Sequence, residues 1–333
     1  MSLTIINDCH LGTLRSSGVT QTSQTALSLY IRERLVALLP QTDLMILGDL
    51  FDKADVALNT LLETFTDLST WLSGGHHLYA VSGNHDDHRT SGKLSSFDML
   101  CSLLLREYPN TVTVVKGKGQ LIPYGYVISH MPNQALFDAE LAKVPECQTL
   151  FCHVNYENFF AARSDQSLNI SKEQVEACKA STVICGHEHQ HKIVGKMRLP
   201  GCQIATSVSD WQGCNYKYKT VIDDNGVAGS VIVAAKETEY IETLWTNPQI
   251  TNHKFVKLVG TATAEQASQV VSAVAKFRAA SPAFIVSNGV TLESDAGTAG
   301  FDAALEGVKS FDVFAALKEV LTESEMNILK ELE

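Results

Sequence analysis

The chain has 333 residues, of which 45% are hydrophobic and 19% are charged, with only 8 prolines. This length exceeds what one small core needs, and the composition excludes a disordered protein. The 37 acidic and 26 basic residues give a formal charge of −11, which is the wrong sign for a protein that holds nucleic acid through its overall field.

The sequence shows no targeting or membrane segment. It opens on Met-Ser-Leu-Thr-Ile-Ile-Asn-Asp, without the basic start and long apolar run of a signal peptide. No later stretch has the roughly 18 uninterrupted apolar residues that a spanning helix needs. The 8 cysteines form no C-x-x-C pair and mostly lie in apolar runs, which indicates buried thiols rather than a zinc finger or a disulfide framework. We therefore expect a cytoplasmic protein with no membrane partner.

The first 240 residues or so alternate apolar, β-rich runs with segments of helical period. Ser23–Leu39 has apolar residues at positions 27, 31, 35 and 38, and Pro40 closes this predicted helix. Asn59–Leu72 is predicted as the next helix. The alternation favours a layered α/β domain in which helices cover the sheets. The predicted strands are Leu3–Asn7, Leu44–Leu47, His77–Val81, Val127–Ser129, Thr149–Cys152 and Val183–Cys185.

The pattern changes near residue 245. Lys254–Val259 is predicted as a strand, Ala264–Ala279 as a helix and Ala283–Val286 as another strand, which together form a small β-α-β unit. A linker at Gly297–Gly300 precedes two short predicted helices, at about 310–321 and 323–332. We therefore expect a catalytic domain over 1–245, a small α+β domain over 246–295 and a helical segment over 296–333.

The polar residues suited to chemistry follow the predicted strands. The carboxyl ends of strands in a layered sheet present such side chains to one crevice. One Asp-x-His pair, or one histidine after an apolar run, is more often structural, but five such elements in one chain together indicate a metal site. They are Asp8-Cys9-His10, Gly48-Asp49-Leu50-Phe51-Asp52, Gly83-Asn84-His85-Asp86, His153 and Gly186-His187-Glu188-His189.

The donor types indicate which ions would bind. Mixed carboxylate, imidazole and amide donors suit Mn²⁺, Fe²⁺ or Zn²⁺, whereas a site for Mg²⁺ alone would be built from oxygen donors. The candidate ligands are too many for one ion. Two ions about 3.5–4 Å apart would bind the attacking and the leaving oxygens of an in-line displacement at phosphorus. Asp49 is the natural bridge, because its carboxylate can give one oxygen to each ion.

These motifs, in this order, resemble the calcineurin-like metallophosphoesterase family, and the match covers most of residues 1–190. The resemblance implies a β-sandwich flanked by helices, with two bound divalent ions. One ion would be held by Asp8, His10 and His189, the other by Asn84, His153 and His187, and Asp49 would be shared.

The resemblance leaves His85 free of metal. Beside a phosphate, an imidazole oriented by a carboxylate can stabilise the transition state or protonate the leaving oxygen, so His85 is the expected catalytic residue; a purely structural role is the alternative. Asp52 and Asp86 are expected to fix imidazole orientation from outside the ligand set. His130 competes with His153 for the single-histidine motif, and His153 is preferred because its distance from His187 along the chain resembles the family's spacing.

The C-terminal third is similar in layout to the SbcD-type DNA double-strand-break repair nucleases. After the last histidines the chain runs through Pro200–Ser209 to Tyr216–Ile222, as these nucleases end their phosphoesterase domain. The β-α-β unit is similar to their capping domain, and its short length is more like phage versions. The terminal helices resemble the segment that binds the SbcC-like SMC-family ATPase; an amphipathic pair folded on its own domain is the alternative.

The resemblance thus implies an Mn²⁺-dependent nuclease subunit. It would act on DNA as an exonuclease at duplex ends and as an endonuclease on single strands or hairpins, with access controlled by the ATPase. A homodimer is expected from the family's habit. Cys9, between two ligands, departs from the family pattern and would make the site sensitive to oxidation or soft metals. The alternatives are a small-molecule phosphodiesterase or phosphatase and, against the complete ligand set, an inactive scaffold.

Overall fold

The structure, a computed structural model, describes residues 2–14, 21–88, 92–158 and 167–293. The chain divides into two compact units. The first contains Met1–Val259 with Ser272–Gly289, and the second contains Gly260–Val271 with Val290–Glu333. The expected domain boundaries at 245 and 295 stay predictions. The expected linker and the two terminal helices lie outside the described residues.

The first sheet has the strand order β14-β13-β1-β2-β3-β4. Strands β1 to β4 run parallel, while β13 returns antiparallel to β1 and β14 forms the edge. Every residue of β1 and of β3 is buried, as expected for parallel strands that are covered on both faces. The bounds are β1 Leu3–Ile6, β2 Asp43–Leu47, β3 Leu78–Val81, β4 Val112–Val115, β13 Tyr216–Ile222 and β14 Ala228–Ala235.

The second sheet has the order β11-β12-β10-β7-β6-β5. Its four inner strands run parallel and the two edge strands run antiparallel. The bounds are β5 Gly119–Ile122, β6 Gly125–Ile128, β7 Cys147–His153, β10 Ala180–Gly186, β11 Lys192–Val194 and β12 Met197–Leu199. A short parallel pair, β8 (Asn155–Tyr156) with β9 (Asn169–Ile170), follows β7.

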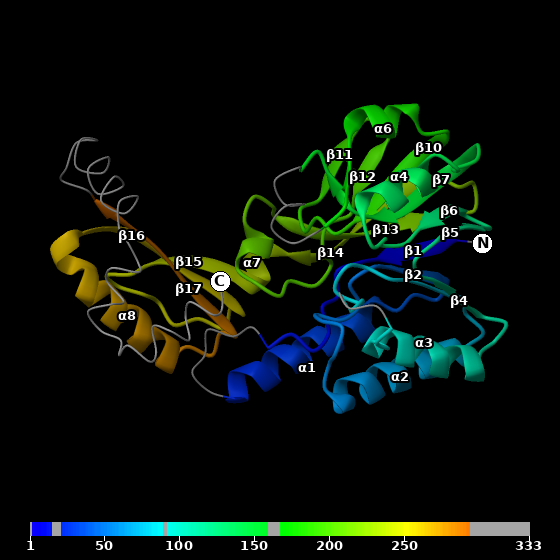
Figure 1. Cartoon of the computed structure of the whole chain (residues 1–333). Helices are drawn as coiled ribbons and strands as arrows, with labels where there is room; N and C mark the ends of the chain where they lie inside the picture. The colour runs from blue at the N-terminus through cyan, green and yellow to red at the C-terminus, as the bar shows by residue number, and fades with distance from the viewer. Residues whose placement is uncertain (1, 15–20, 89–91, 159–166, 294–333) are drawn as a thin grey trace, which may run out of the picture. The chain divides into compact units, whose positions relative to one another are not determined.

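Helices cover the outer face of each sheet (Figure 1). Helices α1 (Gln21–Leu38), α2 (Leu58–Leu72) and α3 (Ser96–Glu107) pack on the first sheet, and α4 (Gln134–Leu141) and α6 (Lys172–Ala177) pack on the second. Helix α1 ends just before Pro40, as predicted. Among the described residues, no helix combines the length and the apolar character that crossing a membrane requires.

Three apolar clusters separate these layers. In β1, Leu3 and Ile5 belong to the cluster between the two sheets, whereas Ile6 belongs to the cluster beneath the helices of the first sheet. Phe151 and Ile184 supply the second sheet's side of the central cluster. Alternate residues of a strand therefore serve different layers, as the pleat requires. The expected fold class, a layered α/β sandwich flanked by helices, is confirmed.

The remaining described residues form a three-stranded sheet in the order β15-β16-β17. After the short helix α7 (Lys236–Glu239) come β15 (Tyr240–Leu244), β16 (Phe255–Thr263), α8 (Ala267–Ala280) and β17 (Ile285–Glu293). The predicted strand-helix-strand pattern is present, with longer strands than expected. Strand β15 is not among the predicted strands, and its sequence Tyr-Ile-Glu-Thr-Leu lies at the end of the expected catalytic domain.

Candidate metal centre

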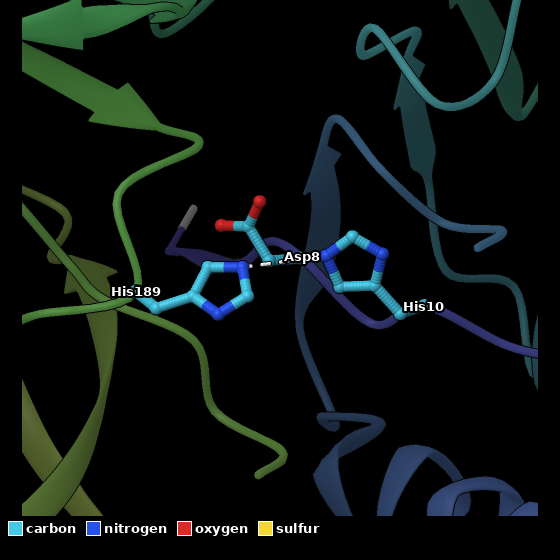
Figure 2. Close-up of side chains that lie close together, drawn as sticks. All are labelled: Asp8, His10 and His189. Carbon is cyan, nitrogen blue, oxygen red and sulfur yellow. Dashed lines mark hydrogen bonds between the residues drawn. The ribbon is translucent and has the colours of Figure 1, made fainter. Parts of the chain in front are cut away.

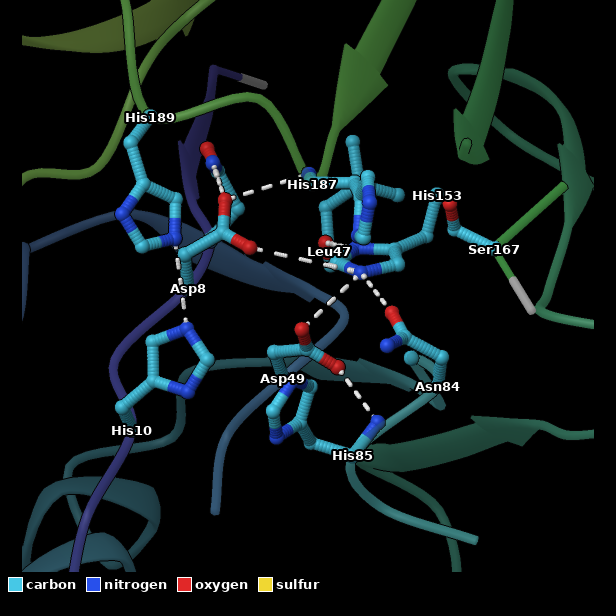
Figure 3. A network of polar contacts seen from close by, with 12 residues as sticks. Asp8, His10, Leu47, Asp49, Asn84, His85, His153, Ser167, His187 and His189 are labelled. Atoms are coloured by element: carbon cyan, nitrogen blue, oxygen red, sulfur yellow. Dashed lines mark hydrogen bonds and ion pairs between the residues drawn. The ribbon is translucent and has the colours of Figure 1, made fainter. Parts of the chain in front are cut away.

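Parallel strands from both sheets end at one place, and the predicted ligands follow these ends (Figure 3). The strand pairing continues past the regular strands, because the Asp8 N–H donates to the Gly48 carbonyl at 3.1 Å and the Gly48 N–H donates to the Val81 carbonyl at 3.0 Å. Strands β1, β2 and β3 thereby lead into the first three motifs, while β7 and β10 deliver the histidines of the second sheet. The side chains brought together are Asp8, His10, Asp49, Asn84, His85, His153, His187 and His189.

Asp8, His10 and His189 form one group in which each offers a donor atom within 4.8 Å of the others. The Nε2 atoms of His10 and His189 lie 3.3 Å apart, along the dashed line in Figure 2. The Nδ1 atom of His189 is bound to Asp210 Oδ1 at 2.7 Å, so its Nε2 atom is the one left for the centre. This division of donors suits one bound cation.

Asp49, His153 and His187 form a second such group. His153 Nε2 lies 3.2 Å from Asp49 Oδ2 and 3.2 Å from Asn84 Oδ1. Its Nδ1 atom donates to the Leu47 carbonyl at 2.9 Å, which fixes the ring. Two further groups overlap these, one of His10, Asp52 and His85 and one of His189, Cys202 and Asp210. Which of these residues bind metal, and which ion each one holds, stays a prediction.

Buried donor atoms without hydrogen-bond partners test whether a metal fits. Asp8 Oδ2 accepts hydrogen bonds from the His187 N–H at 3.1 Å and from the Asn7 side-chain amide. Asp8 Oδ1, in contrast, is buried and accepts no hydrogen bond from the part of the chain that the structure describes. A carboxylate oxygen left this way is costly unless a cation is present. The carboxylate, imidazole and amide donors therefore fit divalent metal ions.

Asp49 and His153 shift each other's pKa values, and each shift favours the charged form. Burial would raise the pKa of the Asp49 carboxyl, but His153 and the other nearby histidines hold it well below its ordinary range. Burial likewise disfavours a charged His153, but Asp49 raises the pKa of His153 to about 10. Without metal, the two residues therefore form a buried ion pair at neutral pH.

His85 is held next to this centre by two hydrogen bonds. Its backbone N–H donates to Asp49 Oδ1 at 2.9 Å, and its Nδ1 atom donates to the Asp52 carbonyl at 2.7 Å. The ring lies edge-on to His10, with centroids 4.9 Å apart. Its Nε2 atom is therefore the ring nitrogen available to a substrate, as an acid-base or phosphate-contacting role requires.

The two supporting carboxylates act in different ways. Asp52 Oδ1 lies 3.6 Å from His10 Nδ1, so its carboxylate faces an imidazole without a hydrogen bond between these two atoms. Asp86 instead accepts from the backbone amides of Gly83 at 2.9 Å and Phe51 at 3.0 Å. Its contacts therefore join two motif loops rather than orient a ring. Burial, followed by the charge of Asp49, raises the pKa of Asp86 to about 7.

The backbone at these strand ends is left-handed. Of the five described non-glycine residues with positive φ, four are candidate ligands: Asp8 at 52°, His10 at 48°, Asp49 at 51° and His187 at 84°. This region is uncommon for side chains other than glycine, asparagine, aspartate and histidine. Such strain persists where the surrounding structure enforces it, and it gathers at functional sites.

Two motif positions require glycine because a candidate ligand lies where a Cβ atom would be. A Cβ atom at Gly48, whose φ is 84°, would overlap the His153 ring. A Cβ atom at Gly83 would overlap the Asp49 carboxylate and its backbone nitrogen. Both glycines therefore leave the space that a candidate ligand occupies.

Two residues considered from the sequence, His130 and Cys9, belong to none of the groups of candidate ligands found among the described residues. Burial, with His153 nearby, lowers the pKa of His130 to about 4, so its ring is neutral. Cys9 packs into the apolar cluster beneath the helices of the first sheet. Burial and the neighbouring Asp8 raise the pKa of its thiol, so Cys9 is neither a thiolate ligand nor an exposed target.

The residues behind the candidate ligands carry no sequence motif and were not predicted. Three of them, Asp210, Asn7 and Gln203, are buried. Asp210 contacts His189, Asn7 contacts Asp8, and Gln203 contacts Asn7. Asp210 lies 21 positions after His189, in a segment without a recognisable motif. Its only local signal is an acidic residue at the start of a short 3₁₀ turn.

A family model described as calcineurin-like phosphoesterase matches residues 1–191. This range contains every predicted ligand. The chain belongs to the calcineurin-like phosphoesterase family. It is therefore a metal-dependent hydrolase of phosphoester bonds, and members of this family use two divalent metal ions.

No curated protein matches the chain. Among solved structures, it is similar to a cold-active protein-tyrosine phosphatase of a psychrophilic Shewanella species, with a TM-score of 0.33 at 10% identity over 69% of this chain and 80% of that one. A second structure titled as cold-active protein tyrosine phosphatase gives a TM-score of 0.31 at 10% identity over 69% and 78% of the two chains. Likeness at this level indicates nothing about the substrate.

Metal binding should release a proton. Because His153 is protonated up to a pH of about 10 without metal and a ligand imidazole must be neutral, Mn²⁺ must displace this proton. Affinity should therefore rise with pH between 6 and 9. Calorimetric titration at one pH in two buffers of different ionisation enthalpy should give different heats. Equal heats in the two buffers would contradict the assignment of His153 as a ligand.

Replacing Gly83 should damage the centre, because a new Cβ atom would overlap both the carboxylate and the backbone nitrogen of Asp49. In Gly83→Ala the new methyl group displaces the Asp49 carboxylate, which should lower phosphodiester hydrolysis on the order of a hundredfold, as for a catalytic group moved by about 1 Å. The matched control is Gly229→Ala, where the nearest atom to a new Cβ is the Val221 carbonyl oxygen at 3.9 Å. Activity and Mn²⁺ binding should both be measured; wild-type values in folded Gly83→Ala would refute the close approach.

Proposed function

We propose that this phosphoesterase is an Mn²⁺-dependent DNA nuclease, the nuclease subunit of an SbcCD-like recombination and repair complex. The layout beyond the ligands carries the proposal. The chain returns through β13 to pair with β1 and then builds the sheet β15-β16-β17 with helix α8. That order is similar to the phosphoesterase and capping domains of SbcD-type nucleases. The proposed substrates are duplex ends for exonuclease action and single strands or hairpins for endonuclease action.

The described residues have the properties that hydrolysis of a phosphodiester requires. Two divalent ions, when bound, supply positive charge to the phosphoryl oxygens and activate water. The chain's own contribution beyond the ligands is His85. With Nδ1 committed to the Asp52 carbonyl, an imidazolium at His85 offers its Nε2 proton to the leaving oxygen, or holds a phosphoryl oxygen by a charged hydrogen bond.

Local cations offer contacts to a nucleic-acid backbone. Lys192 is exposed and Arg198 is partly exposed, and both lie on the hairpin of β11 and β12 that follows His189. Such side chains can bind phosphates even where the overall charge is unfavourable. The formal charge of −11 implies that a partner must supply further backbone contacts.

The same acidic balance favours a second candidate function. A phosphodiesterase or phosphatase for small molecules needs no basic surface to hold a long polyanion. It would turn over small diesters efficiently without a partner protein. The two candidates therefore differ in substrate size and in their need for an ATPase.

Digestion of end-labelled linear duplex DNA with Mn²⁺ tests the proposal. His85→Ala should lower the cleavage rate by about 10²- to 10⁴-fold, the usual contribution of a general acid or base, while metal binding is retained. The matched control is His88→Ala, in the same loop, whose Nε2 atom contacts the exposed Asp55 at 3.1 Å; this variant should keep wild-type activity.

A parallel assay with bis-p-nitrophenyl phosphate distinguishes the two candidates. Efficient turnover of this small diester, with no DNA cleavage even after an SbcC-like ATPase and ATP are added, would overturn the nuclease proposal. It would support the small-molecule phosphodiesterase instead.

We also propose that the protein forms a homodimer through α2 and α3. Each helix exposes a pair of apolar residues spaced by four, which places each pair on one helix face. The exposed fractions are 65% for Leu58 and 50% for Leu62 in α2, and 48% for Met99 and 36% for Leu103 in α3. The two helices are neighbours on the first sheet (Figure 1). Adjacent apolar pairs of this kind are typical of a protein interface.

Introducing charge on this face should separate the dimer. The double variant Leu62→Glu with Met99→Glu would bury two carboxylates in the interface, so its mass by light scattering should fall from that of a dimer to that of a monomer. Leu121→Glu is the control, because Leu121 is 63% exposed on β5 of the other sheet. A wild-type protein that is monomeric at all concentrations tested would refute the dimer.

For the ATPase partner, we propose the segment over 296–333. Its apolar positions Phe311, Phe314, Leu317, Leu321, Ile328 and Leu332 would contact the coiled coil. This segment lies outside the described residues, so the proposal rests on the sequence pattern and on the resemblance.

A further inference from the structure

The segment that follows β12 passes directly behind one group of candidate ligands. It runs from Gly201 to Asp210 and leads into a short 3₁₀ turn, Ser209–Trp211. The family match ends at residue 191, so these residues lie beyond the part of the chain that carries the family motifs. The segment is nonetheless buried for most of its length. Buried polar groups in such a segment require partners.

Asp210 is held rigidly against His189. Its Oδ1 atom binds His189 Nδ1 at 2.7 Å, and its side chain is 4% exposed. Its Oδ2 atom accepts from the backbone N–H groups of Thr206 and Ser207, both at 2.8 Å, and from the Thr206 hydroxyl at 3.2 Å. The turn thus supplies the hydrogen bonds of Asp210 Oδ2, and this holds Asp210 Oδ1 against the His189 imidazole.

The amine of Lys217 holds the turn from behind. The side chain is buried, its Nζ atom donates to the Asp210 carbonyl at 2.5 Å, and it lies 5.2 Å from the centre of the Trp211 ring. A buried ammonium group is tolerated only with such partners. Lys217 therefore fixes the backbone that carries Asp210.

Gln203 reaches the second ligand of the same group through Asn7. The Asn7 backbone N–H donates to Gln203 Oε1 at 2.7 Å, and the Gln203 amide donates to the carbonyls of Gly201 at 2.6 Å and Tyr218 at 2.8 Å. The side-chain amide of Asn7 in turn donates to Asp8 Oδ2. This contact leaves Asp8 Oδ1 as the oxygen that is free to bind a cation.

We infer that Gly201–Asp210 is a positioning element for one of the two metal ions, in which Asp210 orients His189 directly and Gln203 orients Asp8 through Asn7. Both are positioning residues, since neither touches the reacting atoms. The inference rests on two-metal phosphoester hydrolysis, which the proposed function shares, and not on DNA as the substrate.

The chemical basis is the tautomer of His189. A carboxylate that accepts the Nδ1 proton leaves the lone pair on Nε2 and makes this atom a stronger donor to metal. Asparagine at position 210 can instead donate its amide proton to Nδ1, which places the ring proton on Nε2 and blocks the metal. Loss of such a partner typically costs 10–100-fold in metal affinity.

The test is titration of Mn²⁺ into the metal-free full-length chain, followed by the EPR signal of free Mn²⁺, with Co²⁺ absorption as a second signal. Wild type should bind two ions. Asp210→Asn should weaken one ion by about 10–100-fold and change its Co²⁺ band, while the other ion binds as in wild type. Asp210→Glu keeps the accepting carboxylate and should restore part of the affinity. Gln203→Met should weaken the same ion by a smaller factor.

Asp98→Asn is the matched control. Asp98 also accepts backbone and side-chain hydrogen bonds, in the capping box of α3 with Ser95, but it belongs to none of the groups of candidate metal ligands found among the described residues. This variant should lose thermal stability and keep wild-type metal binding. If Asp210→Asn does not fold, Asp210→Glu and Gln203→Met carry the test. Folded Asp210 variants that bind both ions as wild type does, or that weaken both ions equally, would overturn the inference.

The outcome for the proposed function is separate. Suppose that wild type binds both ions, that Asp210→Asn binds one of them more weakly, and that wild type does not cleave DNA. This result would support the positioning element and count against the nuclease. If wild type cleaves DNA and Asp210→Asn binds both ions as wild type does, the nuclease proposal is supported and the positioning element is contradicted.

Discussion

Negative charge buried at one point is the constraint on which the rest of the structure depends. Asp8 and Asp86 are 0% exposed and Asp49 is 1% exposed, and all three face the same junction of strand ends. An unpaired buried carboxylate costs several kcal/mol. Each one is compensated differently: Asp86 by backbone amides and Asp49 by His153. Asp8 accepts amide hydrogen bonds on Oδ2, while its Oδ1 atom lies 4.0 Å from His153 Nε2. The Oδ1 atom of Asp8 accepts no hydrogen bond from the described residues, and it is the oxygen most open to a bound cation.

The scaffold meets this constraint through backbone geometry. Five strand ends converge from two sheets, so the turns that follow must be tight enough for the side chains to share a small space. Left-handed conformations at Asp8, His10, Asp49 and His187 provide these turns. The glycines at positions 48 and 83 leave out the Cβ atoms that would collide with candidate ligands. The cost of this strain is of order 1–3 kcal/mol per residue, which the apolar packing of both sheets must offset. The centre is therefore as rigid as the sandwich that carries it.

Much of the fold could be predicted from the sequence because buried parallel strands are continuous apolar runs. The same argument located the motifs, since their polar residues follow those runs. Helix α3 was not predicted, although its apolar residues at 97, 100, 101 and 104 repeat with helical period and Ser95 forms a capping box with Asp98. Asp210 could not be found this way, because its nearness to His189 depends on how the chain returns past β12. A contact that only the tertiary fold creates leaves no characteristic residue spacing in the sequence.

The origin of the ligands in both sheets has a consequence for the lifetime of the folded protein. Asp49 and Asn84 follow strands of the first sheet, whereas His153 ends a strand of the second, so an ion bound among them links the two halves of the sandwich. Such an ion binds the native state far better than the unfolded chain, and it adds roughly 4 kcal/mol of stability when its free concentration is a thousandfold above Kd. Metal starvation would then shorten the life of the protein by opening it to proteolysis, as well as silencing its chemistry. In this sense the supply of divalent ions sets how much enzyme a cell keeps.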